Sequence, residues 1–239
     1  MCFHNSASVK AQQLKQRYKA DWYREDEEIE PLFHSNGFTF PKWSVLTTHS
    51  PNKFQSYSWG LIPNWCKDKG TAFKMRLNTL NARSETIYEK PSFRGSIKSK
   101  RCLIPSTGFF EWQEYKGNKY PYFIRLKDEP IFSMAGIFET WIDKQTAEVF
   151  NTFSIVTCNA NPLMAKIHNS KERMPVILTR ENEMQWIREE LTESEVKDLM
   201  QPLDENLMQA HTISKLITSR SENTNVPEVQ NPVIYNELV

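Results

Sequence analysis

The sequence predicts an α+β fold: one domain with a β-rich mixed sheet or barrel-like core and helices at the periphery. Short aromatic and β-branched runs bounded by turn residues recur between residues 33 and 178, as expected for strands. Long stretches of helical spacing lie near the two ends, at residues 7–18 and 179–199. No internal repeat or long polar linker divides the 239 residues, so we expect one domain over residues 1–220 and a tail over 221–239.

The first third of the chain combines one helix with several strands. Apolar residues at helical spacing predict a helix over residues 7–18, with Ser6 or Ser8 as its N-cap. Aromatic and β-branched runs predict strands over residues 33–40, 43–48 and 56–63.

The middle of the chain is punctuated by turns. Asparagines at 78 and 81 predict an irregular turn over residues 77–83, and a short basic helix is expected over residues 91–99. A strand is predicted at residues 101–104. The Lys116-Gly117-Asn118 turn then predicts a hairpin of residues 108–114 and 120–126.

The last third predicts two more long strands, a short helix, a short strand and an acidic helix. These elements are expected at residues 131–141, 150–158, 161–168, 174–178 and 179–199. In the acidic helix, the apolar face consists of Met184, Ile187, Leu191, Val196 and Leu199.

Composition excludes several classes of protein. No apolar run reaches transmembrane length and no signal-peptide pattern begins the chain, so we expect no membrane association and a cytoplasmic location. The cysteines are scattered, with no C-x-x-C pair and no matching histidine spacing. This argues for a reducing compartment and against a disulfide framework or a metal site; we expect no metal and no cofactor. The four are Cys2, Cys66, Cys102 and Cys158.

Charge is distributed unevenly along the chain. Residues 51–126 hold fourteen Lys and Arg against five Asp and Glu, a local balance of +9 within a net charge of +1. Acidic residues concentrate at 24–30 and 181–205. A basic middle with acidic flanks suits an anionic ligand on one face, such as a nucleic-acid backbone. A solvated surface with accidental clustering is the alternative.

Cys2 is the most informative residue for function. If Met1 is removed, Cys2 presents an α-amine and a thiol on adjacent carbons. Such a 1,2-aminothiol condenses with an aldehyde to an imine, and its sulfur then closes a thiazolidine ring. Reference pKa values of about 8 for the amine and about 8.5 for the thiol leave both groups reactive near neutrality. The alternative is an inert residue on a frayed terminus.

Three polar stretches lie where packing alone does not explain them. Residues 81–86 could form a satisfied turn or present an amide, a guanidinium and a carboxylate in one pocket. Glu111 sits in an aromatic strand, where alternation allows either solvent exposure or a pocket that raises its pKa. His168 ends a helical segment near Arg173, and a lone histidine is either structural or a proton carrier.

Five motifs occur in order along the chain and together resemble the SRAP family, the SOS response-associated peptidases. They are an initial Met-Cys, W-G-L-I-P at 59–63, N-A-R-S-E-T at 81–86, R-C-L-I-P…G-F-F-E-W at 101–112 and H…R-M-P-V-I-L at 168–178. The resemblance covers the chain from Cys2 to about residue 178. It implies an SRAP-type domain that senses abasic sites in single-stranded DNA.

The resemblance also implies residue roles. Cys2 is the nucleophile that forms a thiazolidine crosslink to the ring-opened abasic sugar, which shields the site from strand cleavage. Asn81 orients the amine or the sugar, Glu111 is the general acid and base, and His168 assists proton transfer and crosslink reversal. Removal of Met1 is a step that the family is proposed to perform on itself.

The DNA-binding residues predicted from the sequence are His4, Trp65, Arg83, Arg94 and Arg173. Arg83 and Arg94 are expected to contact phosphates, and Trp65 to stack on a base. The expected partner is single-stranded DNA with abasic sites, bound by a monomer that is nucleoid-associated when on DNA.

The chain departs from the family pattern in three places. Members usually begin Met-Cys-Gly-Arg, where Phe3 and His4 stand here, and His4 would be a pH-dependent phosphate contact. Residues 169–172 separate His168 from the R-M-P run, so His168 is the nearest equivalent of the family histidine. The family's P-R-Y-N-I-A-P stretch is not recognisable near residues 30–37.

Two other functions fit part of the pattern. Cys2 could act as the N-terminal nucleophile of a peptidase or amidohydrolase, with Asn81 donating to the oxyanion. The basic middle and Trp65 could instead form a non-catalytic module for single-stranded DNA. The electrophile with which Cys2 reacts distinguishes the three possible functions, because only aldehyde capture requires both the amine and the thiol of Cys2.

Overall fold

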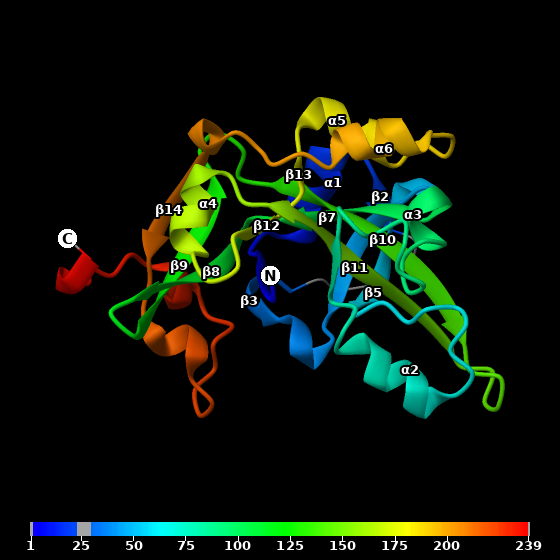
Figure 1. Cartoon of the computed structure of the whole chain (residues 1–239), viewed down its shortest axis with the longest axis horizontal. Helices are drawn as coiled ribbons and strands as arrows, with labels where there is room; N and C mark the ends of the chain where they lie inside the picture. The colour runs from blue at the N-terminus through cyan, green and yellow to red at the C-terminus, as the bar shows by residue number, and fades with distance from the viewer. Residues whose placement is uncertain (1, 23–29, 239) are drawn as a thin grey trace.

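The computed structural model describes residues 2–22 and 30–238. Residues 23–29, which hold most of the predicted acidic run at 24–30, lie outside this description. The α+β prediction is confirmed: two β-sheets form the body of one domain and short helices lie at its periphery (Figure 1). The sequence signals for turns between short apolar runs therefore identified the correct fold class.

The larger sheet closes into a five-stranded barrel. Its ring follows the order β11 (Val149–Asn159), β10 (Phe132–Ile142), β7 (Arg101–Ser106), β4 (Lys42–Thr47) and β5 (Ser50–Trp59). Neighbours along this path are antiparallel, and the ring closes because β5 also pairs in parallel with β11. Closure leaves fewer unpaired strand edges.

Four short strands extend the barrel sheet. β6, which carries Asn81, pairs in parallel with residues 155–157 of β11, and β12 pairs antiparallel with residues 157–159 of the same strand. β6 and β12 thus bring the motifs at residues 81–86 and 168–178 to one strand of the barrel, β11. The four are β2 (Asp21–Trp22), β6 (Asn81–Arg83), β12 (Arg173–Pro175) and β13 (Ile177–Leu178).

The second sheet is antiparallel throughout and contains the N-terminal strand. Its order is β14 (Met208–Thr212), β9 (Asn118–Leu126), β8 (Gly108–Tyr115), β1 (His4–Ala7) and β3 (Leu32–Asn36). β8 and β1 are both interior strands, so each is hydrogen-bonded to a neighbouring strand along both of its edges. The sheet thus places the segment after Cys2 directly beside the strand of Glu111.

Six α-helices lie around the sheets in the described residues. All are short, which is consistent with helices that are stabilised by packing more than by intrinsic propensity. They are α1 (Ala11–Tyr18), α2 (Lys69–Arg76), α3 (Ser96–Ser99), α4 (Pro162–Ile167), α5 (Arg180–Trp186) and α6 (Glu193–Leu199).

The first helix begins later than predicted. The helix expected over residues 7–18 starts at Ala11, because residues 4–7 form β1 between β3 and β8. Ser6 is therefore not a helix cap; its hydroxyl donates to the Leu32 carbonyl over 3.1 Å. Strand pairing with residues distant in sequence overrides the local helical spacing.

The predicted acidic helix over residues 179–199 is divided into α5 and α6. Trp186, at the end of α5, is fully buried, and its indole Nε1 donates to the carbonyls of Cys102 and Gly136 over 3.1 and 3.2 Å. The chain then turns, and Thr192 starts α6 with a capping box that includes Glu195. Burial of Trp186 in the core therefore ends α5, although the helical spacing of the apolar residues predicted that the helix would continue.

Other boundaries also differ from the sequence prediction. β5 covers residues 50–59 and stops at Gly60, whose φ of +100° ends the extended chain, so the strand predicted at 56–63 is shifted. Only four residues of the helix predicted at 91–99 are helical. The sequence patterns missed α2 and β14.

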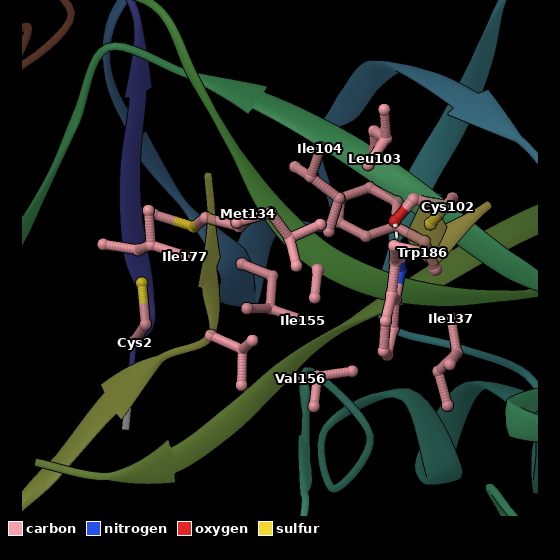
Figure 2. Close-up of a cluster of buried hydrophobic side chains, with 14 of the residues drawn as sticks. Cys2, Cys102, Leu103, Ile104, Met134, Ile137, Ile155, Val156, Ile177 and Trp186 are labelled. Carbon is pink, nitrogen blue, oxygen red and sulfur yellow. Dashed lines mark hydrogen bonds between the residues drawn. The ribbon is translucent and has the colours of Figure 1, made fainter. Parts of the chain in front are cut away.

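Apolar packing continues from the barrel to the N-terminus. Figure 2 shows the side chain of Cys2 at one end of a buried cluster that includes Ile177 and Ile155 and extends to Trp186. Cys2 has no exposed surface. The nucleophile predicted from the sequence is therefore packed into the core, not frayed at the surface.

The C-terminal segment packs against the N-terminal strands. Gln230 donates from Nε2 to Ser6 Oγ and to the Phe33 carbonyl, both over 2.8 Å. The side-chain oxygen of Asn225 accepts from the backbone N–H of Phe33 over 2.7 Å. Val229 is fully buried against Phe110 and its neighbours. Residues 224–230 thus hold β1 and β3 from the far end of the sequence.

Gly108 is required where β8 begins. A Cβ atom there would lie 2.3 Å from the Phe123 ring and 2.9 Å from the Ile124 carbonyl oxygen. We expect Gly108→Ala to lower the free energy of unfolding by about 1–3 kcal/mol, because the strand must shift to accept the methyl group. Urea denaturation measures this effect. Gly95→Ala is the matched control, since nothing lies within 4 Å of its Cβ position; equal losses would contradict the steric argument.

Candidate functional site

Cys2 enters the site from the head of β1. The Cα of His4 pairs with that of Phe110, so the antiparallel chain before His4 runs past Glu111 and Trp112. The Cys2 Sγ lies 3.7 Å from the His4 carbonyl oxygen. Burial raises the pKa of the thiol, and the nearby Glu111 raises it further. The thiol is therefore neutral at physiological pH, and its reaction requires a base at the moment of attack.

Glu111 is buried, although alternation along its strand permitted exposure. β8 is an interior strand of its sheet, and Glu111 retains only 4% of its accessible surface. Burial raises the pKa of its carboxyl group to about 8. Glu111 can thus exist as a neutral acid or as a carboxylate close to physiological pH, which is the property a proton shuttle needs.

His168 faces Glu111 from the end of α4. Asn161 caps that helix by accepting from the Met164 N–H over 2.9 Å, and His168 is its C-cap. His168 Nδ1 lies 2.9 Å from the Arg173 carbonyl oxygen. A carbonyl only accepts, so Nδ1 carries the proton and Nε2 presents its lone pair. Nε2 is 3.7 Å from Glu111 Oε2.

Burial also sets the charge of this histidine. It lowers the pKa of His168 to about 4, so the imidazole is neutral near pH 7. At that pH the pair consists of a neutral acid and a neutral imidazole, whose Nε2 can accept a hydrogen bond from the carboxyl group. A separation of 3.7 Å becomes a hydrogen bond with a small movement of either side chain.

The residues between His168 and the R-M-P motif form a turn that does not displace the histidine. Glu172 adopts a left-handed conformation with φ of 51°, and its N–H donates back to the His168 carbonyl over 2.7 Å. Asn169 exchanges two hydrogen bonds with the backbone of Glu114, at 3.0 and 2.8 Å. Asn169 therefore fastens the end of α4 to the strand that carries Glu111.

Asn81 is placed for binding and is not used in local packing. It begins β6 and is 8% exposed. Neither its Nδ2 nor its Oδ1 has a hydrogen-bond partner among residues 2–22 and 30–238. A buried amide normally finds partners within the protein, so this side chain offers a donor and an acceptor to a bound group.

Two cavities meet at this site. The larger, of about 550 Å³, is lined by residues that include Glu111, His168 and Trp112. The smaller, of about 340 Å³, is lined by residues that include Asn81. Phe3 and Arg83 line both cavities, so the residue that follows Cys2 stands between the acid–base pair and the amide.

Three of the predicted DNA contacts are accessible. Arg83 and Arg94 are exposed, and neither forms an ion pair within the described part of the chain. Trp65 is 46% exposed, with its indole N–H donating to the Pro91 carbonyl over 3.1 Å. Of the three, only Arg83 lines the cavities.

His4 does not provide the cation that the sequence suggested. Its Nδ1 lies 2.8 Å from His34 Nε2, and the two rings stack with centroids 5.1 Å apart. Burial, with a smaller effect of His34, lowers the pKa of His4 to about 3. His4 therefore lines the larger cavity as a neutral ring that also contacts the edge of Trp112.

Arg173 has a structural position. It is 6% exposed, and its guanidinium binds both carboxylate oxygens of Glu85, at 2.5 and 2.9 Å. It also donates to the Thr157 carbonyl over 2.8 Å. Its donors are directed into the protein and not toward a phosphate, contrary to the sequence expectation. Its carbonyl orients His168, so Arg173 is a positioning residue.

Sequence reasoning missed several residues of the site. The larger cavity is also lined by Lys119 and Lys171, two exposed cations that could meet a phosphate. Their positions depend on the β8–β9 hairpin and on the turn after α4, and no local pattern marks them. The bulky residue after Cys2 was visible as a departure, but its place between two cavities was not.

Residues 2–22 and 30–238 contain neither a candidate metal centre nor a candidate membrane-spanning helix. No group of three histidine, cysteine, aspartate or glutamate residues is arranged to hold a metal ion. No helix there has the length and apolar character needed to cross a bilayer.

The buried carboxyl group predicts how stability depends on pH. An unperturbed glutamate titrates at 4.5 and folded Glu111 at about 8, so between these values the native state holds a proton that the unfolded state has released. Stability should fall as pH rises through this range. We expect Glu111→Gln to reduce this fall, as measured by urea denaturation from pH 5 to 8.5. The exposed Glu114→Gln, on the same strand, should leave the slope unchanged; a wild-type slope in Glu111→Gln would contradict the assignment.

The fold and the site together define a class of α+β proteins in which a cysteine at the N-terminus enters a site that contains a buried carboxyl–imidazole pair. The chain belongs to the family described as SOS response associated peptidase (SRAP), whose family model matches residues 1–220. The family prediction from the five motifs is thus confirmed.

Named relatives and a solved structure agree with this assignment. The abasic site processing protein YoqW of Bacillus subtilis is 35% identical over 229 residues, which are 94% of this chain and 97% of that protein. The abasic site processing protein HMCES of Gallus gallus is 33% identical over 73% of this chain and 56% of its own length. A crystal structure of a protein from Bacteroides thetaiotaomicron superposes with a TM-score of 0.91 at 43% identity, covering 98% of this chain and all of that one.

Proposed function

We propose that this protein senses abasic sites in single-stranded DNA and crosslinks to them through Cys2 after Met1 is removed. The observation that carries the proposal is the buried nucleophile next to a neutral acid: Cys2 has no exposed surface and Glu111 affects its pKa. The names of the relatives, which describe abasic site processing, support the choice of substrate.

The first step is condensation. The amine of Cys2 attacks C1′ of the ring-opened sugar, which is an aldehyde, and forms a carbinolamine. Glu111, protonated below its raised pKa of about 8, donates its proton to the carbinolamine hydroxyl, which leaves as water. The products are an iminium ion and the Glu111 carboxylate. Asn81 orients the amine or a sugar hydroxyl with its unpartnered amide group.

The second step closes the ring. The Cys2 thiol is neutral because burial raises its pKa, so it needs a base to attack the iminium carbon. The Glu111 carboxylate formed in the first step takes the thiol proton as the C–S bond forms. The nitrogen becomes a neutral amine within the thiazolidine, and Glu111 is again protonated. One aldehyde oxygen has left as water, and one C–N and one C–S bond have formed.

His168 supports both proton transfers and the reversal of the crosslink. Its Nε2 lone pair faces the Glu111 carboxyl group at 3.7 Å, so it can accept a hydrogen bond from the protonated carboxyl group and orient it. Reversal needs the opposite order, with a proton delivered to sulfur and water admitted to the iminium carbon. Arg173 fixes the imidazole for this role through its carbonyl oxygen.

The DNA backbone crosses the rim of the two cavities. Arg83 touches both, and Lys119 and Lys171 line the larger one, so the sugar can enter while phosphates stay at the surface. Arg94 and Trp65 extend this surface as weaker contacts. One chain supplies the whole site, and the protein acts as a monomer. Crosslinking would keep the abasic site from strand cleavage during the response to DNA damage.

Neutralising Arg83 should weaken DNA binding in a salt-dependent way. Arg83 is exposed and unpaired with any acidic side chain in the described ranges, so each phosphate contact it makes displaces a counterion. We expect Arg83→Ala to weaken binding to all DNA sequences and to reduce the slope of log K against log salt by about one unit. Fluorescence anisotropy at several salt concentrations measures this. An unchanged slope would remove Arg83 from the DNA-binding surface; the exposed Arg220→Ala, outside both cavities, is the control.

A denaturing gel tests the proposed function directly. The protein is mixed with single-stranded DNA that carries one abasic site, and no reductant is added. The proposal predicts a complex that survives detergent and heat, and none with intact DNA. A non-catalytic binding module would show no such complex. An N-terminal peptidase or amidohydrolase would react with acyl substrates and leave the abasic DNA free.

A further inference from the structure

Phe3 and Phe38 form an aromatic surface beside the reactive cysteine. Their ring centroids are 4.8 Å apart and the rings are tilted by 41°. Phe38 is 46% exposed, and Leu77, which lines the smaller cavity, is 52% exposed. Exposed apolar side chains next to a buried, unpartnered amide are typical of a ligand site.

The backbone holds this aromatic pair in place. The Gly37 N–H donates to the Phe3 carbonyl over 2.8 Å, and the Asn36 side chain accepts from the Phe38 N–H over 3.0 Å. A Cβ at Gly37 would lie 3.2 Å from three ring atoms of Trp59, so the turn is packed tightly against the barrel. Because the two rings are already held in place, the protein loses little conformational entropy when a ligand stacks on them.

The cavity beside this pair has the size and chemistry for a base. It measures about 340 Å³, which lies within the range of about 300–1,000 Å³ seen for small-ligand pockets. Its lining combines the Phe3 and Phe93 rings with the amides of Asn78 and Asn81, and Arg83 and Lys90 add positive charge. Aromatic faces with nearby cations are the usual platform for single-stranded nucleic acid.

The position of Phe3 next to Cys2 in the chain restricts which nucleobase can enter the smaller cavity. Phe3 follows Cys2 in the chain and also lines the larger cavity, which contains Glu111 and His168. When the abasic sugar occupies the larger cavity, a group in the smaller one is on the adjacent nucleotide. We infer that the smaller cavity binds the nucleobase next to the abasic nucleotide, stacked on Phe3, whose ring is packed against Phe38. This inference rests on the proposed function.

Binding to an unreactive analogue tests the inference. The probes are single-stranded oligonucleotides with one tetrahydrofuran abasic analogue, which lacks the aldehyde, and versions in which the 5′ or the 3′ neighbouring base is also removed. The proteins are wild type, Phe3→Ala and Phe38→Ala. The control is Phe73→Ala, which is partly exposed on α2 and packs on Phe150. Intact mass measurements establish that Met1 is processed equally in all of them.

We expect the loss of affinity on removing a neighbouring base to depend on whether the Phe3 and Phe38 rings are present. Removing one of the two neighbouring bases should weaken wild-type binding by about 10-fold, within the range for base–aromatic stacking. Phe3→Ala and Phe38→Ala should bind the parent probe less tightly and lose little more when that same base is removed. Removal of the other neighbouring base should weaken binding by the same factor in wild type, Phe3→Ala and Phe38→Ala. Phe73→Ala should behave as wild type with every probe.

Equal losses for wild type, Phe3→Ala and Phe38→Ala with both base deletions would overturn the inference, as would undetectable wild-type binding to the analogue. Phe38→Ala keeps the test decisive if Phe3→Ala misfolds, because Phe38 is exposed and distant in sequence from Cys2. Crosslinking to a true abasic site is measured in parallel. Its absence in wild type would refute the proposed function, whereas crosslinking without ring–base coupling would refute the base-binding cavity alone.

Discussion

Replacing Cys2 with alanine is expected to abolish the covalent complex with abasic single-stranded DNA. Alanine keeps the α-amine but has no sulfur, so the reaction stops at an imine that water reverses. Cys2→Ser should give at most the same labile imine, which only borohydride would trap, because its hydroxyl does not form a stable sulfur ring. The yield of complex on a denaturing gel, measured with and without borohydride, distinguishes the thiazolidine linkage from the imine.

The matched control is Cys66→Ala, which removes another buried thiol from an apolar cluster separate from that of Cys2. It should crosslink as wild type does. Equal yields of reductant-free complex from wild type and Cys2→Ala would refute the thiazolidine mechanism. Crosslinking that survives in Cys2→Ser without borohydride would favour chemistry that a hydroxyl can also perform.

Glu111→Gln should slow crosslinking by up to about 10²–10⁴-fold, the usual contribution of general acid–base catalysis. The amide has a similar shape but cannot donate the proton that removes water or accept the thiol proton. The wild-type rate should also decline as pH rises above about 8, where the neutral acid is lost, and Glu111→Gln should lack this decline. Rates are measured by quenched time courses from pH 6 to 9.

His168→Ala separates formation from release. It should slow formation less than Glu111→Gln does, because Glu111 remains, and it should prolong the crosslink by impairing proton delivery to sulfur. The exposed Glu222→Gln, which lies outside both cavities, is the control for a change of charge. A wild-type rate in Glu111→Gln between pH 6 and 8 would show that the carboxyl group takes no part in the chemistry.

Local signals predicted the elements whose stability is mainly local. The hairpin around Gly117 is present as β8 and β9, and α4 occupies Pro162–Ile167 within the helix predicted at residues 161–168. The start of α1 and the division of the acidic helix were not predictable in this way. They depend on the pairing of β1 with β3 and β8 and on the burial of Trp186, which involve residues far apart in the chain.

The same distinction applies to the site. The order of motifs predicted Cys2, Asn81, Glu111 and His168 as site residues. In the structure Asn81 lines the smaller cavity and Glu111 and His168 line the larger one, while Cys2 is buried next to Phe3, which lines both. The sequence did not reveal the charge states. Residue type alone suggested cations for DNA at His4 and Arg173. Their partners, His34 and Glu85, lie 30 and 88 residues away and make one neutral and the other structural.

The attachment of residues 224–230 to β1 and β3 has a consequence for biosynthesis. Cys2 leaves the ribosome before Asn225 and Gln230, which fasten the strand that follows it. During translation the N-terminus has no complete sheet to enter, so it stays open to enzymes that act on nascent chains. The contacts that fasten β1 from residues 224–230 form only after those residues have left the ribosome.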